Sequence, residues 1–261
     1  MLRHNCITRL ASLDLAEQRR AGYRLTDWPA ATLGGHRVGV VTEKAPTAGN
    51  GRENTAMPGM PAPAVGERAS LLEYLRYQHQ AFFVTAYGLT DEQARCTPTA
   101  SALSIGGLIK HVTTMEYAWT QQVVAAPARL QNDPWSLQGM MVTWAHREQQ
   151  FVMRPDDTLE ELLESLKAQN AASMHVFAEV DLGDVVEVPV HIHAAYGCSS
   201  DCTVRWVLLH LIDEFTRHAG HSDIIRESID GATMYELMAA VEHWPETSTF
   251  KPWKPASGSG V

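Results

Sequence analysis

The sequence contains few cysteines and no apolar run long enough to cross a bilayer. Its 261 residues include four cysteines, and no apolar segment near Met1 resembles a signal peptide. We therefore expect a cytoplasmic protein without disulfides. A transmembrane helix needs about 20 consecutive apolar residues. Every apolar run in this chain is much shorter, so we expect no membrane span.

The sequence also lacks a basic stripe and the common phosphate-binding and hydrolase motifs. The formal net charge is -9, with 21 Lys and Arg against 30 Asp and Glu. A protein that binds nucleic acid concentrates positive charge along one surface instead. The patterns GxxxxGK[ST], GxGxxG, GxSxG and HExxH are all absent, which removes the commonest nucleotide-binding, hydrolase and metalloprotease classes. We expect a small-molecule substrate and no nucleic-acid partner.

Charge and composition divide the chain near residue 65. Residues 1–65 hold eight basic and five acidic groups and lead into the run PTAGNGRENTAMPGMPAPAVG, whereas residues 66–261 hold 13 basic and 25 acidic groups, a net charge of -12. The run has too few apolar side chains to offset the entropy lost on folding. We expect a flexible or irregular extension over residues 1–65 and one folded domain over residues 66–261.

Beyond residue 66, apolar residues recur at helical spacing. Four long amphipathic helices are predicted, and together they indicate an all-α, antiparallel four-helix bundle. Short capping-box patterns and a final Asp-Gly pair mark further helix ends. The run Val185–Val190 is apolar and β-branched but isolated, and predicts an extended connector. The expected long helices begin near Glu67, Ser104, Thr158 and Thr203.

The last long helix, VRWVLLHLIDEFTRHAGHSDIIRESIDG, directs a carboxylate and imidazoles toward the apolar interior. Glu214 and His218 lie one turn apart on the face that also carries Leu211 and Phe215. Burying such groups without a partner costs several kcal/mol, and a cation suits an i, i+4 Glu/His pair. The second helix directs His111 to the same interior. These three residues would hold a divalent metal and leave coordination positions open, as catalytic zinc requires.

Each of these residues has an alternative role. An inward histidine is often a hydrogen-bonded core residue, and Trp119 is either core packing or part of a pocket wall. His210 and His221 are expected beside the metal or at the pocket mouth. His191 and His193, followed by two cysteines, match no standard zinc site and are expected to line the rim of the bundle. Glu116 and the arginines at positions 205, 217 and 226 are expected to be solvated.

Three stretches resemble a known family. They are ERASLLEYLRYQHQAF, GLTDEQARCTPTASALSIGGLIKHVTTMEYAW and VRWVLLHLIDEFTRHAGHSDIIRESIDGAT. They resemble the DinB/YfiT superfamily of metal-binding four-helix bundles, in the branch related to mycothiol-dependent maleylpyruvate isomerase and mycothiol S-transferases. Many relatives carry three histidines, the last two in an HxxxH pair. Here Glu214 stands at the first position of that pair, as in the maleylpyruvate isomerase branch, and the ligands implied by position are His111, Glu214 and His218.

The resemblance implies thiol chemistry. A divalent metal, zinc or alternatively nickel or iron, would bind mycothiol as thiolate, and the thiolate would attack an electrophilic carbon in S-transfer or isomerisation. Two other functions remain open at this stage. One is a thiol-independent metalloenzyme of a biosynthetic pathway (a hydrolase, isomerase or cyclase), and the other is a non-catalytic, metal-stabilised binding module. A homodimer is a further expectation, because bundles of this kind have flat apolar faces.

Overall fold

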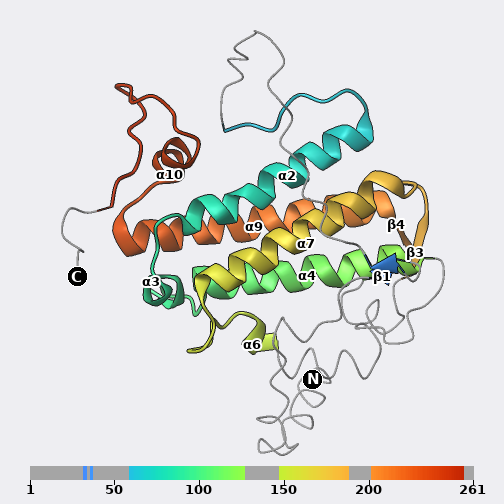
Figure 1. The fold of residues 1–261 in the computed structure, drawn as a ribbon, viewed down its shortest axis with the longest axis horizontal. Helices are drawn as coiled ribbons and strands as arrows, with labels where there is room; N and C mark the ends of the chain where they lie inside the picture. The colour runs from blue at the N-terminus through green and yellow to red at the C-terminus, as the bar shows by residue number, and fades with distance from the viewer. Residues whose placement is uncertain (1–31, 34–35, 38–58, 127–146, 188–200, 256–261) are drawn as a thin grey trace, which may run out of the picture. The chain divides into compact units, whose positions relative to one another are not determined.

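The computed structural model describes residues 32–33, 36–37, 59–126, 147–187 and 201–255. Four long helices dominate the described chain, and shorter helices lie between and after them (Figure 1). The long helices are α2 (Glu67–Ala86), α4 (Ile105–Ala125), α7 (Leu159–Glu179) and α9 (Val204–Asp230). The shorter helices are α3 (Asp91–Arg95), α6 (Arg147–Gln150) and α10 (Met234–Val241).

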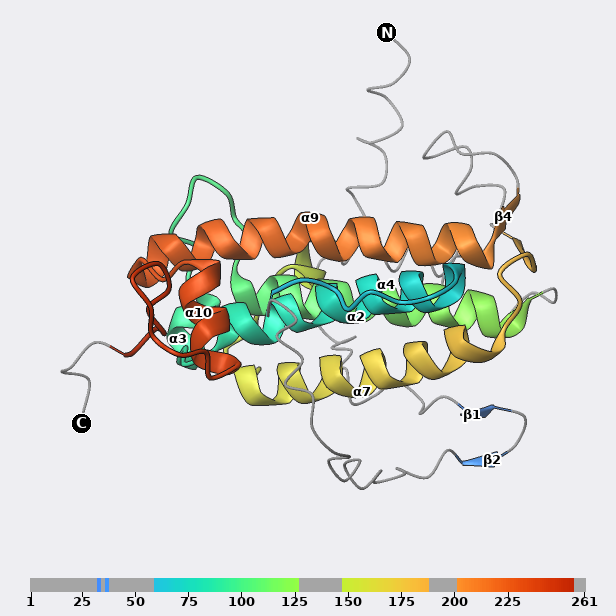
Figure 2. The same ribbon diagram turned by 90° about the horizontal axis from the view of Figure 1, so that it is seen from above.

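The long helices pack as a four-helix bundle, which confirms the predicted all-α bundle, although not all of its neighbouring helices are antiparallel. Helix α2 packs against α9 and α7, and α4 packs against the same two helices, so α2 and α4 lie on one diagonal. Figure 2 shows the four helices side by side along a common axis. Contacts at their ends give the directions. Arg205 at the start of α9 pairs with Glu67 at the start of α2, and Arg226 near the end of α9 binds the backbone at the end of α2.

In the bundle, some neighbouring helices run parallel and others run antiparallel. Helices α2 and α9 run parallel, and so do α4 and α7, since Lys110 near the start of α4 pairs with Asp157 just before α7. Helix α2 is antiparallel to α7, because Arg68 donates to the backbone oxygen of Phe177. Helix α4 is antiparallel to α9, because His111 lies beside His218 and Trp119 beside His210. The long helices therefore run up, down, down and up.

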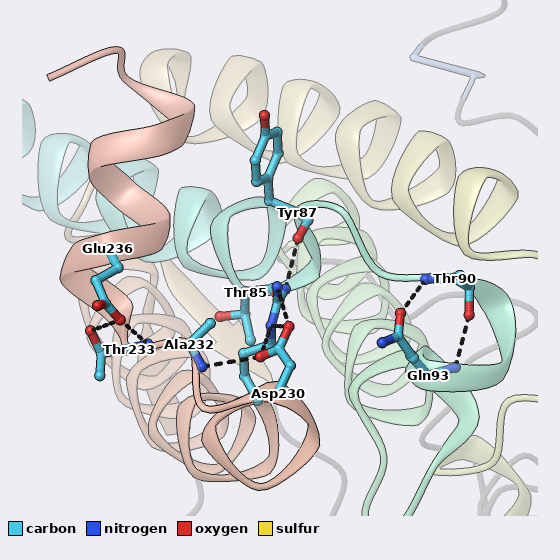
Figure 3. Close-up of polar contacts among 9 residues, drawn as sticks. Thr85, Tyr87, Thr90, Gln93, Asp230, Ala232, Thr233 and Glu236 are labelled. Carbon is cyan, nitrogen blue, oxygen red and sulfur yellow. Dashed lines mark hydrogen bonds and ion pairs between the residues drawn. The ribbon is translucent and has the colours of Figure 1, made fainter. Parts of the chain in front are cut away.

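The helix ends follow the capping chemistry expected from the sequence. The side chains of Ser104, Thr158 and Thr203 each accept a hydrogen bond from a backbone N–H in the first turn of α4, α7 and α9, respectively. Thr90 and Gln93 form a reciprocal capping box, and the Glu236 carboxylate binds Thr233 in the same way (Figure 3). These bonds satisfy donors that a helix start leaves without partners.

The connection between α7 and α9 differs from the sequence prediction. Val185 was expected to begin an isolated extended connector, but β3 (Val185–Glu187) pairs antiparallel with β4 (Asp201–Thr203). The partner strand is three residues long and has no alternating apolar pattern, so its pairing is invisible in the sequence. Residues 188–190 of the predicted connector lie outside the described residues. The β3–β4 pair lies at the end of the bundle opposite α3 and α10 (Figure 2).

Residues 1–45 belong to a unit separate from residues 46–261. Its described residues are β1 (Thr32–Leu33) and β2 (His36–Arg37), which pair antiparallel with Leu33 opposite His36. The rest of this unit and residues 46–58 lie outside the described part of the chain. The predicted irregular extension over residues 1–65 and the domain boundary that follows it stay predictions.

Each long helix buries one apolar face in the centre of the bundle. Among the described residues, no helix is long and apolar enough to cross a membrane. A smaller cluster holds α10 against α2 through Val84, Leu237 and Met238. The expected homodimer stays a prediction. The fully buried apolar side chains of the main core include Leu75, Phe82, Leu108, Ile109, Leu166, Phe177, Leu208 and Leu211.

Arg226 of α9 is a fully buried arginine that binds the end of α2. This corrects the expectation that Arg226 is solvated. The exposed fraction of Arg226 is 0%. Its Nη1 donates to the backbone oxygens of Thr85 (2.7 Å) and Tyr87 (2.8 Å), and its Nε and Nη2 donate to the carboxylate of Asp230. Asp230 also accepts from the backbone N–H of Ala232 (3.1 Å; Figure 3). The guanidinium therefore compensates the end of α2 and a carboxylate on α9 together.

Replacing this guanidinium should destabilise the protein strongly. Arg226→Met leaves the backbone oxygens of Thr85 and Tyr87 and the partly exposed carboxylate of Asp230 without their donor, and we expect a loss of about 1–3 kcal/mol in the free energy of unfolding. The matched control is Arg217→Met, because Arg217 and Asp213 also lie four residues apart but have side chains 65% and 64% exposed. Urea denaturation of the control should differ from wild type by less than about 0.5 kcal/mol. Equal losses in both variants would contradict this account of Arg226.

Candidate metal centre

Three potential metal ligands meet between the antiparallel helices α4 and α9. His111 on α4 and Glu214 and His218 on α9 place one ligand atom each within 4.8 Å of one another. Among the described residues, this is the group of three His, Cys, Asp or Glu side chains that could share a cation. The sequence predicted the same three residues from the helical spacing of α4 and α9. Their proximity fits that prediction and makes this the candidate metal centre.

The distances and exposures of these side chains suit a cation that a small molecule can reach. His218 Nε2 lies 3.4 Å from Glu214 Oε2, and two ligand atoms bound to one tetrahedral zinc lie about 3.3 Å apart when each bond is near 2.05 Å. His111 and His218 are 8% and 9% exposed. The Glu214 side chain is 26% exposed, so solvent approaches the group from the side of the carboxylate.

The charges at the centre also favour a cation. The hydrogen bond with His218 holds the pKa of Glu214 below its ordinary value, and this effect is larger than the opposing effect of partial burial. Glu214 is therefore an anion at neutral pH. Burial lowers the pKa of His210, although Glu214 and Asp213 act in the opposite direction. A neutral His210 leaves the negative charge of Glu214 available to a metal.

Two further histidines of α9 lie next to the group. His221 is exposed, and its Nδ1 lies 3.4 Å from Nδ1 of His218. With Nε2 of His218 facing Glu214, this contact can fix the tautomer of His218, which is a common role for groups around a metal ligand. His210 lies one turn before Glu214, and its Nε2 is 3.9 Å from Glu214 Oε1.

Aromatic rings surround this part of the bundle. Trp119 of α4 is 6% exposed, and its ring centroid lies 5.2 Å from that of His210 in an edge-to-face contact. Trp206 stacks on His210 at 5.0 Å, also contacts Trp119 at 5.5 Å, and is 41% exposed. Phe151, which the sequence reasoning did not consider, stacks on His111. A residue outside the four long helices leaves no signal in their periodicity.

The second predicted cluster, from His191 to Cys202, lies mostly outside the described residues. His191, His193 and Cys198 lie outside the described residues, so their expected place at the rim of the bundle stays a prediction. Cys202 belongs to β4, where its thiol donates to the backbone oxygen of Val186 at 3.5 Å. Within the part of the chain that the structure describes, Cys202 joins no group that could hold a metal.

Glu116 is fully buried, which corrects the expectation of a solvated glutamate. One carboxylate oxygen accepts from Ser173 Oγ at 2.5 Å, and His79 Nε2 lies 2.8 Å from the same oxygen. The other oxygen accepts from the side-chain amide of Asn170 at 2.8 Å, with the amide nitrogen turned toward the carboxylate. Helices α2, α4 and α7 each contribute to this Glu116 cluster. Because its partners come from separate helices, no spacing along one helix could reveal it.

The Glu116 cluster should contribute strongly to stability. Glu116→Ala leaves His79, Ser173 and Asn170 without a common acceptor in a dry interior, and we expect a loss of about 3–5 kcal/mol in the free energy of unfolding. Glu164→Ala on the exposed face of α7 is the control and should change stability by less than about 0.5 kcal/mol. Thermal and urea unfolding measure both effects. A loss below about 1 kcal/mol for Glu116→Ala would show that the cluster is not a main support of the bundle.

The fold and these donors define a class, namely four-helix bundles with a candidate cation site between two antiparallel helices. The family model for mycothiol S-transferases matches residues 70–231, which is more than half of the chain. The chain belongs to this family, and the matched region contains all three candidate ligands. This confirms the family resemblance expected from the sequence.

The comparisons with solved structures and with curated proteins do not identify a function. One solved structure with similarity is the crystal structure of a conserved protein from Enterococcus faecalis. It is 18% identical, covers 65% of this chain and 100% of its own, and superposes with a TM-score of 0.45. Among curated proteins, no sequence matches this chain. The family assignment therefore rests on the mycothiol S-transferase model.

Proposed function

We propose that this protein is a divalent-metal-dependent enzyme that activates mycothiol, or a similar small thiol, for reaction with an electrophilic small molecule. The observation that carries the proposal is the proximity of His111, Glu214 and His218 in a chain of the mycothiol S-transferase family. Two imidazoles and a carboxylate are a common donor set for catalytic zinc. Nickel and iron are alternatives with the same donors.

The bound metal would supply one chemical effect, which is to lower the pKa of a coordinated thiol so that it is a thiolate at neutral pH. The thiol proton leaves to solvent through the exposed side of Glu214. The thiolate sulfur then forms a bond to the electrophilic carbon, and the leaving group departs with the electron pair of the bond that breaks. In an isomerisation, the same sulfur adds and is later expelled, so no group is lost.

The residues around the centre have separate roles in this proposal. Glu214 lowers the charge of the site and leaves one side open, and His221 orients His218 through their 3.4 Å contact. His210 lies beside Glu214, and Trp206 stacks on His210. These two rings form an apolar wall against which the organic part of an electrophile can pack.

The first test is metal binding. We expect the purified protein to bind about one zinc per chain and His218→Ala to lose most of it after dialysis, because two ligands alone rarely retain zinc. His175→Ala is the matched control, since His175 is an exposed histidine of α7. Elemental analysis gives the stoichiometry, and circular dichroism shows whether each variant is folded. A wild-type protein without stoichiometric divalent metal would refute the assignment, and so would a folded His218→Ala that retains it.

The second test is thiol transfer. We expect the metal-loaded protein to join mycothiol to monobromobimane, and Glu214→Ala or a chelator to reduce the rate at least about 100-fold, because the metal supplies several kcal/mol. Asp213→Ala, which removes the exposed carboxylate next to Glu214, is the control and should retain activity. Mass spectrometry of the conjugate measures the product. If a metal-binding wild type forms no conjugate, a reaction of water or of the substrate itself becomes the favoured function.

A further inference from the structure

The segment between α6 and α7 brings an aromatic ring onto the candidate metal centre. Phe151 stacks on His111 with ring centroids 3.9 Å apart and planes inclined by 24°. Its centroid is also 5.9 Å from that of His218, at an inclination of 53°. Phe151 is thus a neighbour of both imidazoles that would bind the metal, although it belongs to neither of the helices that carry them.

Two glycines at the start of α4 permit this approach. A Cβ added at Gly107 would lie 1.9 Å from the backbone oxygen of Phe151, and one added at Gly106 would lie 2.3 Å from the sulfur of Met153. Real Cβ atoms never come so close to backbone oxygen. Gly107 is therefore required for the Phe151 backbone to lie directly on α4, one turn before His111, and Gly106 gives room to the Met153 side chain.

Polar contacts hold the same segment at its other end. Lys110 Nζ donates to Asp157 Oδ2 at 2.7 Å and to the backbone oxygen of Val152 at 3.4 Å. Arg95 donates to the backbone oxygens of Arg154 and Asp157, at 3.1 and 2.9 Å. Lys110, which precedes His111 in the sequence, and Arg95 together hold the backbone on both sides of Met153. The position of the Phe151 ring is determined by several independent contacts.

We propose that Phe151 is a positioning residue for His111 and, with it, for the metal. This inference rests on the proposed metal-binding function. A stacked ring at 3.9 Å restricts rotation of the imidazole about its χ2 angle, so the ligand nitrogen stays directed at the centre before the metal arrives. The ring also covers one face of the His111 imidazole with apolar atoms, which strengthens the electrostatic interaction of Glu214 with a cation.

Zinc affinity of the full-length protein tests this proposal directly. We expect Phe151→Leu to weaken zinc binding about 10–100-fold, which is the usual effect of removing a group that orients a metal ligand. Gly107→Ala should have a similar effect with Phe151 intact, because it displaces the segment. The double variant should bind no more weakly than the weaker single variant, since both changes remove one contact. Competition with a chromophoric chelator gives the affinities.

Two control variants separate positioning from general packing. Val152→Ala changes the adjacent side chain, which is 49% exposed. Gly220→Ala adds a methyl group to α9 where no atom lies within 4 Å. Both should bind zinc within about twofold of wild type. The visible spectrum of the cobalt-substituted protein gives a second readout, and we expect it to change in Phe151→Leu and to stay constant in both controls.

The outcomes distinguish the proposal from the function on which it rests. If wild type binds no zinc, the metal-binding function fails. If wild type binds zinc and a folded Phe151→Leu binds it within twofold with an unchanged cobalt spectrum, the positioning role fails and Phe151 only fills space. If Gly107→Ala does not fold, Phe151→Leu alone decides, because Leu retains most of the apolar volume of the ring.

Discussion

The cost of removing carboxylates wholly or partly from water is the constraint on which this structure depends. A carboxylate that leaves water must gain donors or a cation, since otherwise its burial costs several kcal/mol. Asp230, whose side chain is 21% exposed, gains a guanidinium, and the fully buried Glu116 gains a hydroxyl, an amide and an adjacent imidazole. Within the described part of the chain, Glu214 lies 3.4 Å from His218 and 3.9 Å from His210. These contacts are the longest of the three carboxylates, and the 26% exposed side chain of Glu214 keeps one side open to a cation.

This comparison explains why the candidate ligands were predictable from the sequence and the other two clusters were not. Glu214 and His218 are four residues apart on one helix, so the helical period places them together. His111 lies on the inward face of its own helix. The partners of Glu116 come from two other helices, and no period relates them. Arg226 was expected in solvent because long charged side chains normally reach the surface, but the end of α2 offers it backbone acceptors.

The same limit applies to the topology. The capping residues define where each helix begins and ends, because capping depends on groups a few residues apart. The directions of the helices depend on which pairs become neighbours, and this is set by contacts between distant segments such as Lys110 with Asp157. The pairing of β3 with β4 is of the same kind. Local chemistry thus predicts the elements of this bundle well, whereas its internal polar contacts and its mixed helix directions emerge only in three dimensions.

Two polar contacts between α9 and α2, one near each end of α9, differ greatly in their contribution to stability. The pair of Arg205 with Glu67 at the start of α9 has side chains 42% and 55% exposed, and such a pair contributes little to stability. The buried Arg226 holds the other end. We therefore expect local opening of α9 to begin at the β3–β4 end and to reach Glu214 before His218. On this expectation the two α9 ligands differ in local stability, and the carboxylate that faces solvent lies on the side that opens first.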